Sequence, residues 1–443
     1  MDDLLKKKGD TSWFVKDRFG LFIHWGLYSM GARHEWLRNL EHIGNEEYDL
    51  KYFKHFEPDL YNPDEWAEMA KNAGMKYFVI TTKHHEGFAL WDSKHTDYKA
   101  TNTLAGKDLL RPMVEAFRSR GIKVGFYHSL IDWHHDQYIL DDKNHPHCND
   151  PELIKKMNEG RDHMKYVDFL HAQVRELLTD FGKIDLLWFD FSFPDEDNRL
   201  DFSTGKGREA WRSAELYTMI RELQPDIMIN DRLDLPGMGG DMKTPEQYQP
   251  RKGFEIDGEK VVWEACQTFS GSWGYHRDEM TWRTSRQLIS TLIDCVSKGG
   301  NLLMNVGPTA RGEFDHRAIE RLNALGAWMH YHSRSIYNCG EAPEEFKSPE
   351  KCRLTYNSEK RRIYVHIFDW PYKHLHLDGK CFVEQVEYAQ FLHDASEVQV
   401  KGLEQWQIHS ALSAGFDTEN TLTLTIPQQE PNVEIPVIEL FLK

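Results

Sequence analysis

Asp190 is the residue whose sequence neighbours most strongly indicate a catalytic role. It closes the apolar run IDLLWFDFSF, residues 184–193. Such a run is typical of a buried strand, and the ionisable group at its end needs a defined place. In a parallel α/β barrel that place is the rim at the carboxyl ends of the strands, where catalytic groups collect. A carboxylate that caps the next helix or pairs with an arginine remains the alternative at this stage.

Further apolar runs carry polar, titratable residues in the same way. These runs are FGLFIHWG with His24, YFVITTKHHEG with His84 and His85, VGFYHS with Tyr127 and His128, IMINDR with Asp231 and Arg232, and VVWEAC with Glu264. Parallel strands that finish in such residues predict one shared catalytic rim.

Strands and helices alternate up to about residue 330, which is the pattern that would position this rim. In residues 62–74, for example, Asn62 is a predicted N-cap, Pro63 takes the first helical position and Gly74 ends the helix. Helices are also predicted within residues 106–121, 158–182, 207–225, 285–300 and 316–332. This alternation indicates an α/β fold with a mostly parallel sheet, and we expect a (β/α)8-like barrel over residues 1–340.

After about residue 340 the pattern changes to short alternating runs such as RRIYVHIF and TLTLTIP. Asn, Asp, Gly and Ser separate these runs, which is typical of antiparallel strands. We expect a small antiparallel β-sandwich over residues 341–443. Two long irregular segments, 141–151 and 233–258, lie in the first domain, where loops of this length are often functional.

The composition narrows the classes of partner. The 443 residues include 54 Lys and Arg against 71 Asp and Glu, a net charge of −17, which argues against nucleic acid or an anionic membrane surface. No apolar run approaches the length of a membrane span, and MDDLLKKKGDTSW lacks the apolar stretch of a signal peptide. The six cysteines form no CxxC pair, so we expect free thiols and a cytoplasmic, reducing setting unless a leader was removed. A homo-oligomer remains open.

Nine motifs between residue 13 and about residue 340 resemble those of one known family, and they occur in the same order as in that family. They are FGLFIHWGLYS, GARHEWLRN, KYFVITTKHHEGFALWDSK, KVGFYHSLIDW, LLWFDF, INDR, WEACQTF, SWGY and KGGNLLMNVGP. Together they resemble glycoside hydrolase family 29, the retaining α-L-fucosidases. The resemblance implies that the substrate is a fucosylated oligosaccharide or glycoconjugate and that no cofactor is needed.

The resemblance also implies roles for individual residues. The nucleophile closes the LLWFD strand and is therefore Asp190. The acid/base follows NDR on a loop that reads KTPEQY, which points to Glu246, whereas strand-end position alone favours Glu264 as the competing candidate. The sugar-binding residues map onto His24, Glu35, Trp36, His84, His85, Tyr127, Arg232 and Trp273. The chain has Tyr127-His128-Ser129 where the family often has YYS, so Tyr127 and His128 both remain candidates for facing the sugar.

Two other functions stay open from the residues alone. The rim histidines His24, His84, His85 and His128 could serve a metal-dependent hydrolase. However, adjacent strand residues point to opposite faces, and no HExxH motif accompanies them. Neutral imidazoles that bind sugar hydroxyls fit the pattern better, and no metal is expected. A carbohydrate-binding protein without catalysis is the other alternative, although it would not need two carboxylate candidates.

Overall fold

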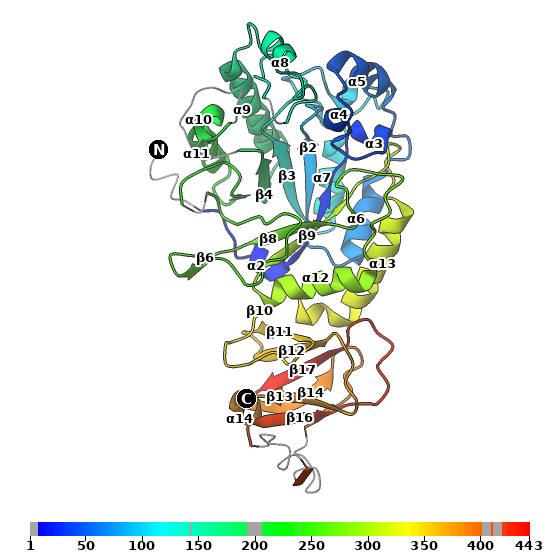
Figure 1. Cartoon of the computed structure of the whole chain (residues 1–443), viewed down its shortest axis with the longest axis vertical. Helices are drawn as coiled ribbons and strands as arrows, with labels where there is room; N and C mark the ends of the chain where they lie inside the picture. Colours follow the sequence, from blue (N-terminus) through cyan, green and yellow to red (C-terminus); the bar gives the residue numbers. More distant parts are fainter. Residues whose placement is uncertain (1–7, 142–143, 193–205, 238, 401–408, 411–418) are drawn as a thin grey trace.

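The computed structural model describes residues 8–141, 144–192, 206–237, 239–400, 409–410 and 419–443. A parallel sheet with helices around it forms one unit, and antiparallel sheets form the other (Figure 1). Helices α12 (Ser285–Ser297) and α13 (His316–His332) lie between the two units.

The parallel sheet has seven strands and carries the rim predicted from the sequence. Its strands are β1 (Phe19–Ile23), β2 (Tyr77–Lys83), β3 (Lys123–Ser129), β4 (Leu186–Asp190), β5 (Met228–Ile229), β8 (Glu264–Thr268) and β9 (Asn301–Val306). They are ordered β5-β4-β3-β2-β1-β9-β8, and every neighbouring pair is parallel. Most strand residues are buried, as expected for a parallel sheet covered on both faces.

The edge strands β5 and β8 are joined through an irregular segment rather than through a strand. Residues 242–246 make single parallel bridges, in which Met242 pairs with Asn230, Lys243 with Trp263, and Glu246 with Cys266. The described residues therefore form a curled sheet of seven parallel strands, with this segment along its seam.

The helices follow the expected signals, with one exception. In α6 (Pro63–Asn72) the Asn62 side chain accepts a hydrogen bond from the Glu65 backbone, and α12 begins with a capping box of Thr284 and Gln287. A single helix predicted within 207–225 is instead two, α10 (Arg208–Trp211) and α11 (Ser213–Leu223). They are separated by Arg212 in the left-handed conformation (φ 47°).

Further helices and one hairpin complete this unit. They are α2 (Phe14–Asp17), α3 (Tyr28–Gly31), α4 (Leu37–Leu40), α5 (Asn45–Lys51), α7 (Leu110–Ser119), α8 (Pro151–Met157), α9 (His163–Asp180), the 3-10 helices η1 (Phe53–His55), η2 (Ala100–Asn102) and η3 (Ser333–Ser335), and the hairpin β6 (Glu255–Ile256) and β7 (Glu259–Lys260).

The second unit consists of two antiparallel sheets. One has β10 (Gly340–Glu341), β11 (Cys352–Asn357), β12 (Arg362–Ile367), β17 (Val437–Leu442) and β14 (Val386–Phe391), in that order, and the other has β13 (His374–Asp378), β16 (Thr421–Thr425) and β15 (Gln399–Val400). Helix α14 (Lys380–Gln385) links β13 to β14. Val365 and Ile438 of the first sheet share a core with Leu377 and Leu424 of the second, as in a sandwich. The predicted domain boundary between residues 340 and 341 falls inside β10.

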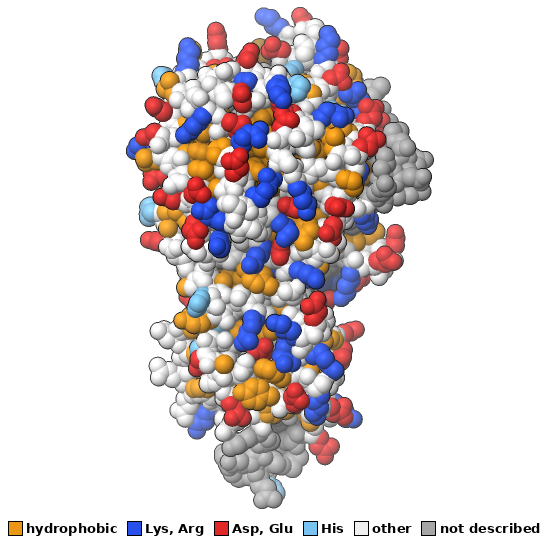
Figure 2. Space-filling view, turned by 180° about the vertical axis from the view of Figure 1, so that it is seen from behind, with side chains coloured by type: hydrophobic (Ala, Val, Ile, Leu, Met, Phe, Trp, Pro, Cys, Tyr) orange, Lys and Arg blue, Asp and Glu red, His pale blue; other side chains and the backbone are white. Residues whose placement is uncertain are grey.

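The surface mixes charges of both signs. Figure 2 shows acidic and basic side chains interspersed over both units on the face that it presents. Among the described residues, no helix is long and apolar enough to cross a membrane.

Candidate active site

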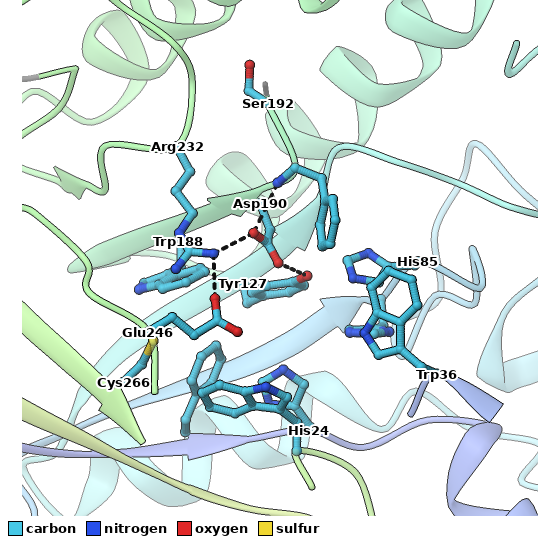
Figure 3. A pocket seen from close by; sticks show the side chains of 14 residues that line it. His24, Trp36, His85, Tyr127, Trp188, Asp190, Ser192, Arg232, Glu246 and Cys266 are labelled. Carbon is cyan, nitrogen blue, oxygen red and sulfur yellow. Dashed lines mark hydrogen bonds and ion pairs between the residues drawn. The ribbon is translucent and has the colours of Figure 1, made fainter. Parts of the chain in front are cut away.

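A cavity of about 280 Å³ lies at the carboxyl ends of the parallel strands. Its lining includes residues that end or closely follow four strands: His24 after β1, His84 and His85 after β2, Asp190 at the end of β4, and Arg232 three residues after β5. The full lining is Phe22, His24, Trp36, His84, His85, Tyr127, Trp188, Asp190, Phe191, Ser192, Arg232, Glu246, Cys266 and Trp273. The rim predicted from strand ends is therefore a real cavity (Figure 3).

Asp190 is held in one orientation by three donors. Its Oδ1 accepts from Arg232 Nη1 at 2.7 Å and from the Phe191 backbone N–H at 3.0 Å. Its Oδ2 accepts from the Tyr127 hydroxyl at 3.0 Å. Burial, and after it the nearby Asp190 charge, raise the pKa of Tyr127 well above its ordinary value, so the phenol keeps its proton for this bond.

Glu246 is ion-paired to the same guanidinium group of Arg232 as Asp190. Arg232 Nη1 is 2.8 Å from Glu246 Oε2, so the Asp190 and Glu246 oxygens that share this nitrogen lie within about 5.5 Å of each other, the sum of the two contacts. Burial pulls the pKa of Arg232 down, but Asp190 and then Cys266 and Glu246 more than offset this and raise it. Arg232 is also placed 4.3 Å above the Trp188 ring and donates to the Thr244 carbonyl. A fixed cation thus stands between the two carboxylates (Figure 3).

His24 presents a neutral ring with a defined tautomer. Asn305 donates through Nδ2 to the Trp273 carbonyl at 2.6 Å, so its Oδ1 faces His24 Nδ1 at 2.6 Å as an acceptor. His24 Nδ1 therefore carries the proton, and Nε2 is left as an acceptor. Burial lowers the pKa of His24 to about 3, which keeps the ring neutral.

His85 has the same arrangement on the neighbouring strand. Ser129 donates to the Ile131 carbonyl at 2.9 Å, so its oxygen accepts from His85 Nδ1 at 2.7 Å. Burial lowers the pKa of both His85 and His84 well below the ordinary value. The Nε2 atoms of the neutral His24 and His85 rings can accept hydrogen bonds from sugar hydroxyl groups.

Aromatic side chains supply the rest of the cavity wall. Trp273 lies 5.1 Å from the His24 ring and 5.8 Å from Phe22, and Trp36 lies 5.2 Å from the His85 ring. Flat apolar faces beside hydroxyl-binding imidazoles match a deoxy-sugar, which has both an apolar and a polar side.

Glu35 is buried beside the cavity but is not part of its lining. Its Oε2 accepts from the Gly274 backbone at 2.7 Å. This hydrogen bond connects the segment that carries Trp36 to the segment that carries Trp273. The two segments are far apart in the sequence, and each contributes a tryptophan to the cavity lining. The structure gives Glu35 this supporting contact, whereas the resemblance implied direct sugar binding.

His128 also lies away from the cavity. Successive strand residues point to opposite faces, so Tyr127 points to the inner face of the curled sheet and His128 to its outer face. His128 Nδ1 lies 2.9 Å from Thr82 Oγ1, and its ring is 6.0 Å from Trp91. Of the two candidates, Tyr127 is the one that lines the cavity.

Glu264 lies at the end of the curled sheet away from the rim. It is the first residue of β8, and Tyr77, the first residue of β2, donates to its Oε2 at 2.5 Å. Parallel strands place their first residues at the end far from the rim. Burial raises the pKa of Glu264 to about 8. The expectation that Glu264 sits at the catalytic end of its strand is therefore wrong, because it begins the strand.

Five lining residues were missed by the sequence reasoning: Phe22, Trp188, Phe191, Ser192 and Cys266. Period-two counting could have found two of them, since Phe22 precedes His24 and Trp188 precedes Asp190 by two positions on the same strand face. Phe191 gave no such signal. It has φ 68°, a left-handed conformation that costs a non-glycine residue about 1–2 kcal/mol.

The histidines do not form a metal site within the described residues, where no group of three or more His, Cys, Asp or Glu side chains is arranged to hold a metal ion. The Nδ1 atoms of His24 and His85 are already used in hydrogen bonds.

Comparison with known proteins agrees with this geometry. The family described as alpha-L-fucosidase matches residues 2–334. The tissue alpha-L-fucosidase of Bos taurus is 31% identical over 81% of this chain and 75% of its own length. The solved structure of alpha-L-fucosidase isoenzyme 1 from Paenibacillus thiaminolyticus is 43% identical, covers 98% of both chains and has a TM-score of 0.88.

A second solved structure captures a reaction intermediate. It is a trapped covalent intermediate of a GH29 alpha-L-fucosidase from Bacteroides thetaiotaomicron, with 27% identity, 99% coverage of this chain, 98% of that chain and a TM-score of 0.80. The matched family covers most of the chain and includes every residue of the cavity. The chain belongs to the alpha-L-fucosidase family.

Proposed function

We propose that this chain hydrolyses terminal α-L-fucosyl residues of oligosaccharides or glycoconjugates with retention, using Asp190 as nucleophile and Glu246 as acid/base. The observation that carries the proposal is the pair of carboxylates held on one arginine nitrogen, within about 5.5 Å of each other. Retaining glycosidases need two carboxyl groups roughly 5 Å apart, whereas inverting ones need more room for a water molecule.

In the first step Asp190 attacks the anomeric carbon. Its Oδ1 is bonded by Arg232 and the Phe191 N–H, so Oδ2, held only by the Tyr127 hydroxyl among the bonds described, is the oxygen we assign to the attack. Glu246 gives its proton to the glycosidic oxygen as the bond to the aglycone breaks. The products of this step are the free aglycone and a fucosyl ester on Asp190.

Glu246 must leave Arg232 to do this, because an arginine favours the ionised form of a carboxyl group and the acid has to carry a proton. Its side chain is 39% exposed, and it lies on an irregular segment next to Gln247, which has φ 48°. The exposure suits a side chain that turns toward a bound glycoside. Arg232 then stays on Asp190.

In the second step Glu246 acts as the base. It takes a proton from a water molecule, the water oxygen attacks the anomeric carbon, and the ester bond to Asp190 breaks. Fucose is released with its original configuration. The neutral His24 and His85 rings accept hydrogen bonds from sugar hydroxyls throughout, because burial keeps them uncharged.

Related proteins support the residue types. The Bacteroides thetaiotaomicron intermediate was trapped with 2-fluoro-fucosyl fluoride in a variant that has a glutamate replaced by glutamine. A Thermotoga maritima fucosynthase, 26% identical with a TM-score of 0.76, has an aspartate replaced by glycine. An aspartate and a glutamate are also the two residue types proposed as catalytic in this chain.

We also infer that the parallel unit is a variant of the (β/α)8 barrel. Residues 242–246 take the place of an eighth strand, since they bridge to both edge strands in parallel orientation. This irregular stretch is also the one that carries Glu246.

The test is hydrolysis of an aryl α-L-fucoside by the wild type and by Asp190→Ala, both with a chelator present. We expect robust turnover by the wild type and a loss of several orders of magnitude in the variant. A folded wild type without turnover would contradict the proposal, and activity that disappears with the chelator would return the histidines to a metal-dependent role.

A further inference from the structure

Phe191 joins the nucleophile to the wall of the cavity. Its backbone N–H donates to Asp190 Oδ1 at 3.0 Å. Its ring lies 4.6 Å from the His85 ring in an edge-to-face arrangement and 5.5 Å from Trp36. One residue therefore contacts both the attacking carboxylate and a sugar-binding imidazole.

The backbone of Phe191 is strained, with φ 68°. Glycine adopts this conformation without a steric penalty and would keep the same N–H in place. The hydrogen bond to Asp190 therefore does not explain why a phenylalanine stands here. What glycine would lack is the ring, which lines the cavity beside His85.

The left-handed turn also decides where the ring points. Residues after a strand normally continue its alternation, which would send the side chain of Phe191 to the face opposite Asp190. Instead, both Asp190 and Phe191 line the cavity. The strained turn thus places two consecutive side chains in one site, a strain that persists at functional sites when the surroundings hold it.

We propose that Phe191 is a positioning residue, whose ring holds His85 against Trp36 while its N–H orients the carboxylate of Asp190. The inference rests on the proposed function, because it assigns the ring a part in the same displacement. His85 is fixed at Nδ1 by Ser129, and the ring of Phe191 restricts its other side.

Three variants separate the ring from the backbone. Phe191→Gly removes the ring and relieves the strain, Phe191→Ala removes the ring and keeps the strain, and Phe191→Tyr keeps the ring. The readouts are Tm and the kcat/KM for an aryl α-L-fucoside. We expect Phe191→Gly to have a higher Tm than Phe191→Ala, yet both to lose roughly ten- to hundred-fold in kcat/KM, with Phe191→Tyr close to the wild type.

Arg361 provides the matched control. It also has a left-handed conformation, with φ 52°, but it is exposed in the turn between β11 and β12 of the antiparallel unit. Arg361→Gly should likewise have a higher Tm than Arg361→Ala. Both variants should keep the kcat/KM of the wild type.

The outcomes are distinct. If the wild type turns over and the Gly or Ala variant at position 191 keeps its kcat/KM, the ring has no positioning role and the inference is overturned. If kcat/KM recovers in Phe191→Gly in step with its Tm, the residue is only structural, which also overturns it. If the wild type itself fails to turn over, the proposed function has failed instead.

Discussion

Asp190 and Glu246 are both ion-paired to a single nitrogen, Nη1 of Arg232, at 2.7 and 2.8 Å. The two carboxylates come from segments with different geometry: Asp190 ends a regular strand, and Glu246 lies in an irregular stretch that bridges to Cys266. Before a substrate binds, their spacing is thus set by one guanidinium group, which Trp188 and Thr244 hold in place.

Replacing this arginine should therefore impair catalysis without removing the positive charge. Arg232→Lys keeps a cation but cannot maintain contacts with Asp190, Glu246 and Thr244 together, since an ammonium group lacks the planar fork. We expect kcat/KM to fall by about a hundred-fold, measured on an aryl α-L-fucoside. Arg311→Lys, in an exposed pair with Asp59, is the control and should have no effect. Full activity in Arg232→Lys would show that charge alone is enough.

Azide rescue distinguishes the two acid/base candidates. In Glu246→Ala, azide should occupy the space of the carboxylate, attack the fucosyl ester without a general base and yield a fucosyl azide. Glu264→Ala should show no such rescue, because Glu264 lies at the other end of the barrel, bonded to Tyr77. Products are identified by mass spectrometry. A fucosyl azide formed only by Glu264→Ala would reverse the assignment.

Glu264 should instead make stability depend on pH. Burial raises its pKa from an ordinary value near 4.5 to about 8 in the folded chain. Below pH 4.5 both the folded and the unfolded chain carry the proton. Between about pH 4.5 and 8 only the unfolded chain ionises, so the free energy of unfolding declines over this window, by on the order of a few kcal/mol.

Glu264→Gln tests this linkage, because the amide cannot ionise and its oxygen can still accept from Tyr77. The urea-unfolding free energy of the variant should decline less between pH 5 and pH 8 than that of the wild type. Equal slopes in the two proteins would mean that Glu264 is not the group responsible.

The neutral state of His24 can be tested through its partner Asn305. Asn305→Asp places a carboxylate next to His24 Nδ1 and should raise the pKa of His24 from about 3. A protonated ring no longer accepts a sugar hydroxyl, and protonation happens as the pH falls. The acid limb of the kcat/KM profile should therefore move to higher pH. A profile identical to that of the wild type would show that His24 need not be neutral; thermal melts at the same pH values check that the variant stays folded.

Much of this site could be predicted because strand ends and motifs are local in the sequence. The run that ends at Asp190, the histidines after β1 and β2 and the capping residues of α6 all follow from short-range patterns. The prediction that failed depended on where a strand begins, which the periodicity of apolar residues does not show. The apolar run around Glu264 shows a buried strand, but not that Glu264 begins it.

The choice between Tyr127 and His128 shows the same limit. Alternation says that they face opposite sides, yet only the neighbouring strands decide which side is the barrel interior. The left-handed turns at Arg212 and Phe191 are likewise set by tertiary contacts, since neither residue favours that conformation by itself.

The most direct test of the central claim is to trap the covalent intermediate on Asp190. The protein is incubated with 2-fluoro-fucosyl fluoride, digested and mapped by tandem mass spectrometry. We predict a single 2-fluoro-fucosyl adduct, carried by the carboxyl group of Asp190 and absent from Asp190→Ala. An adduct on Glu246 or Glu264, or a protein that hydrolyses fucosides but never carries the label, would contradict the assignment of Asp190 as the nucleophile.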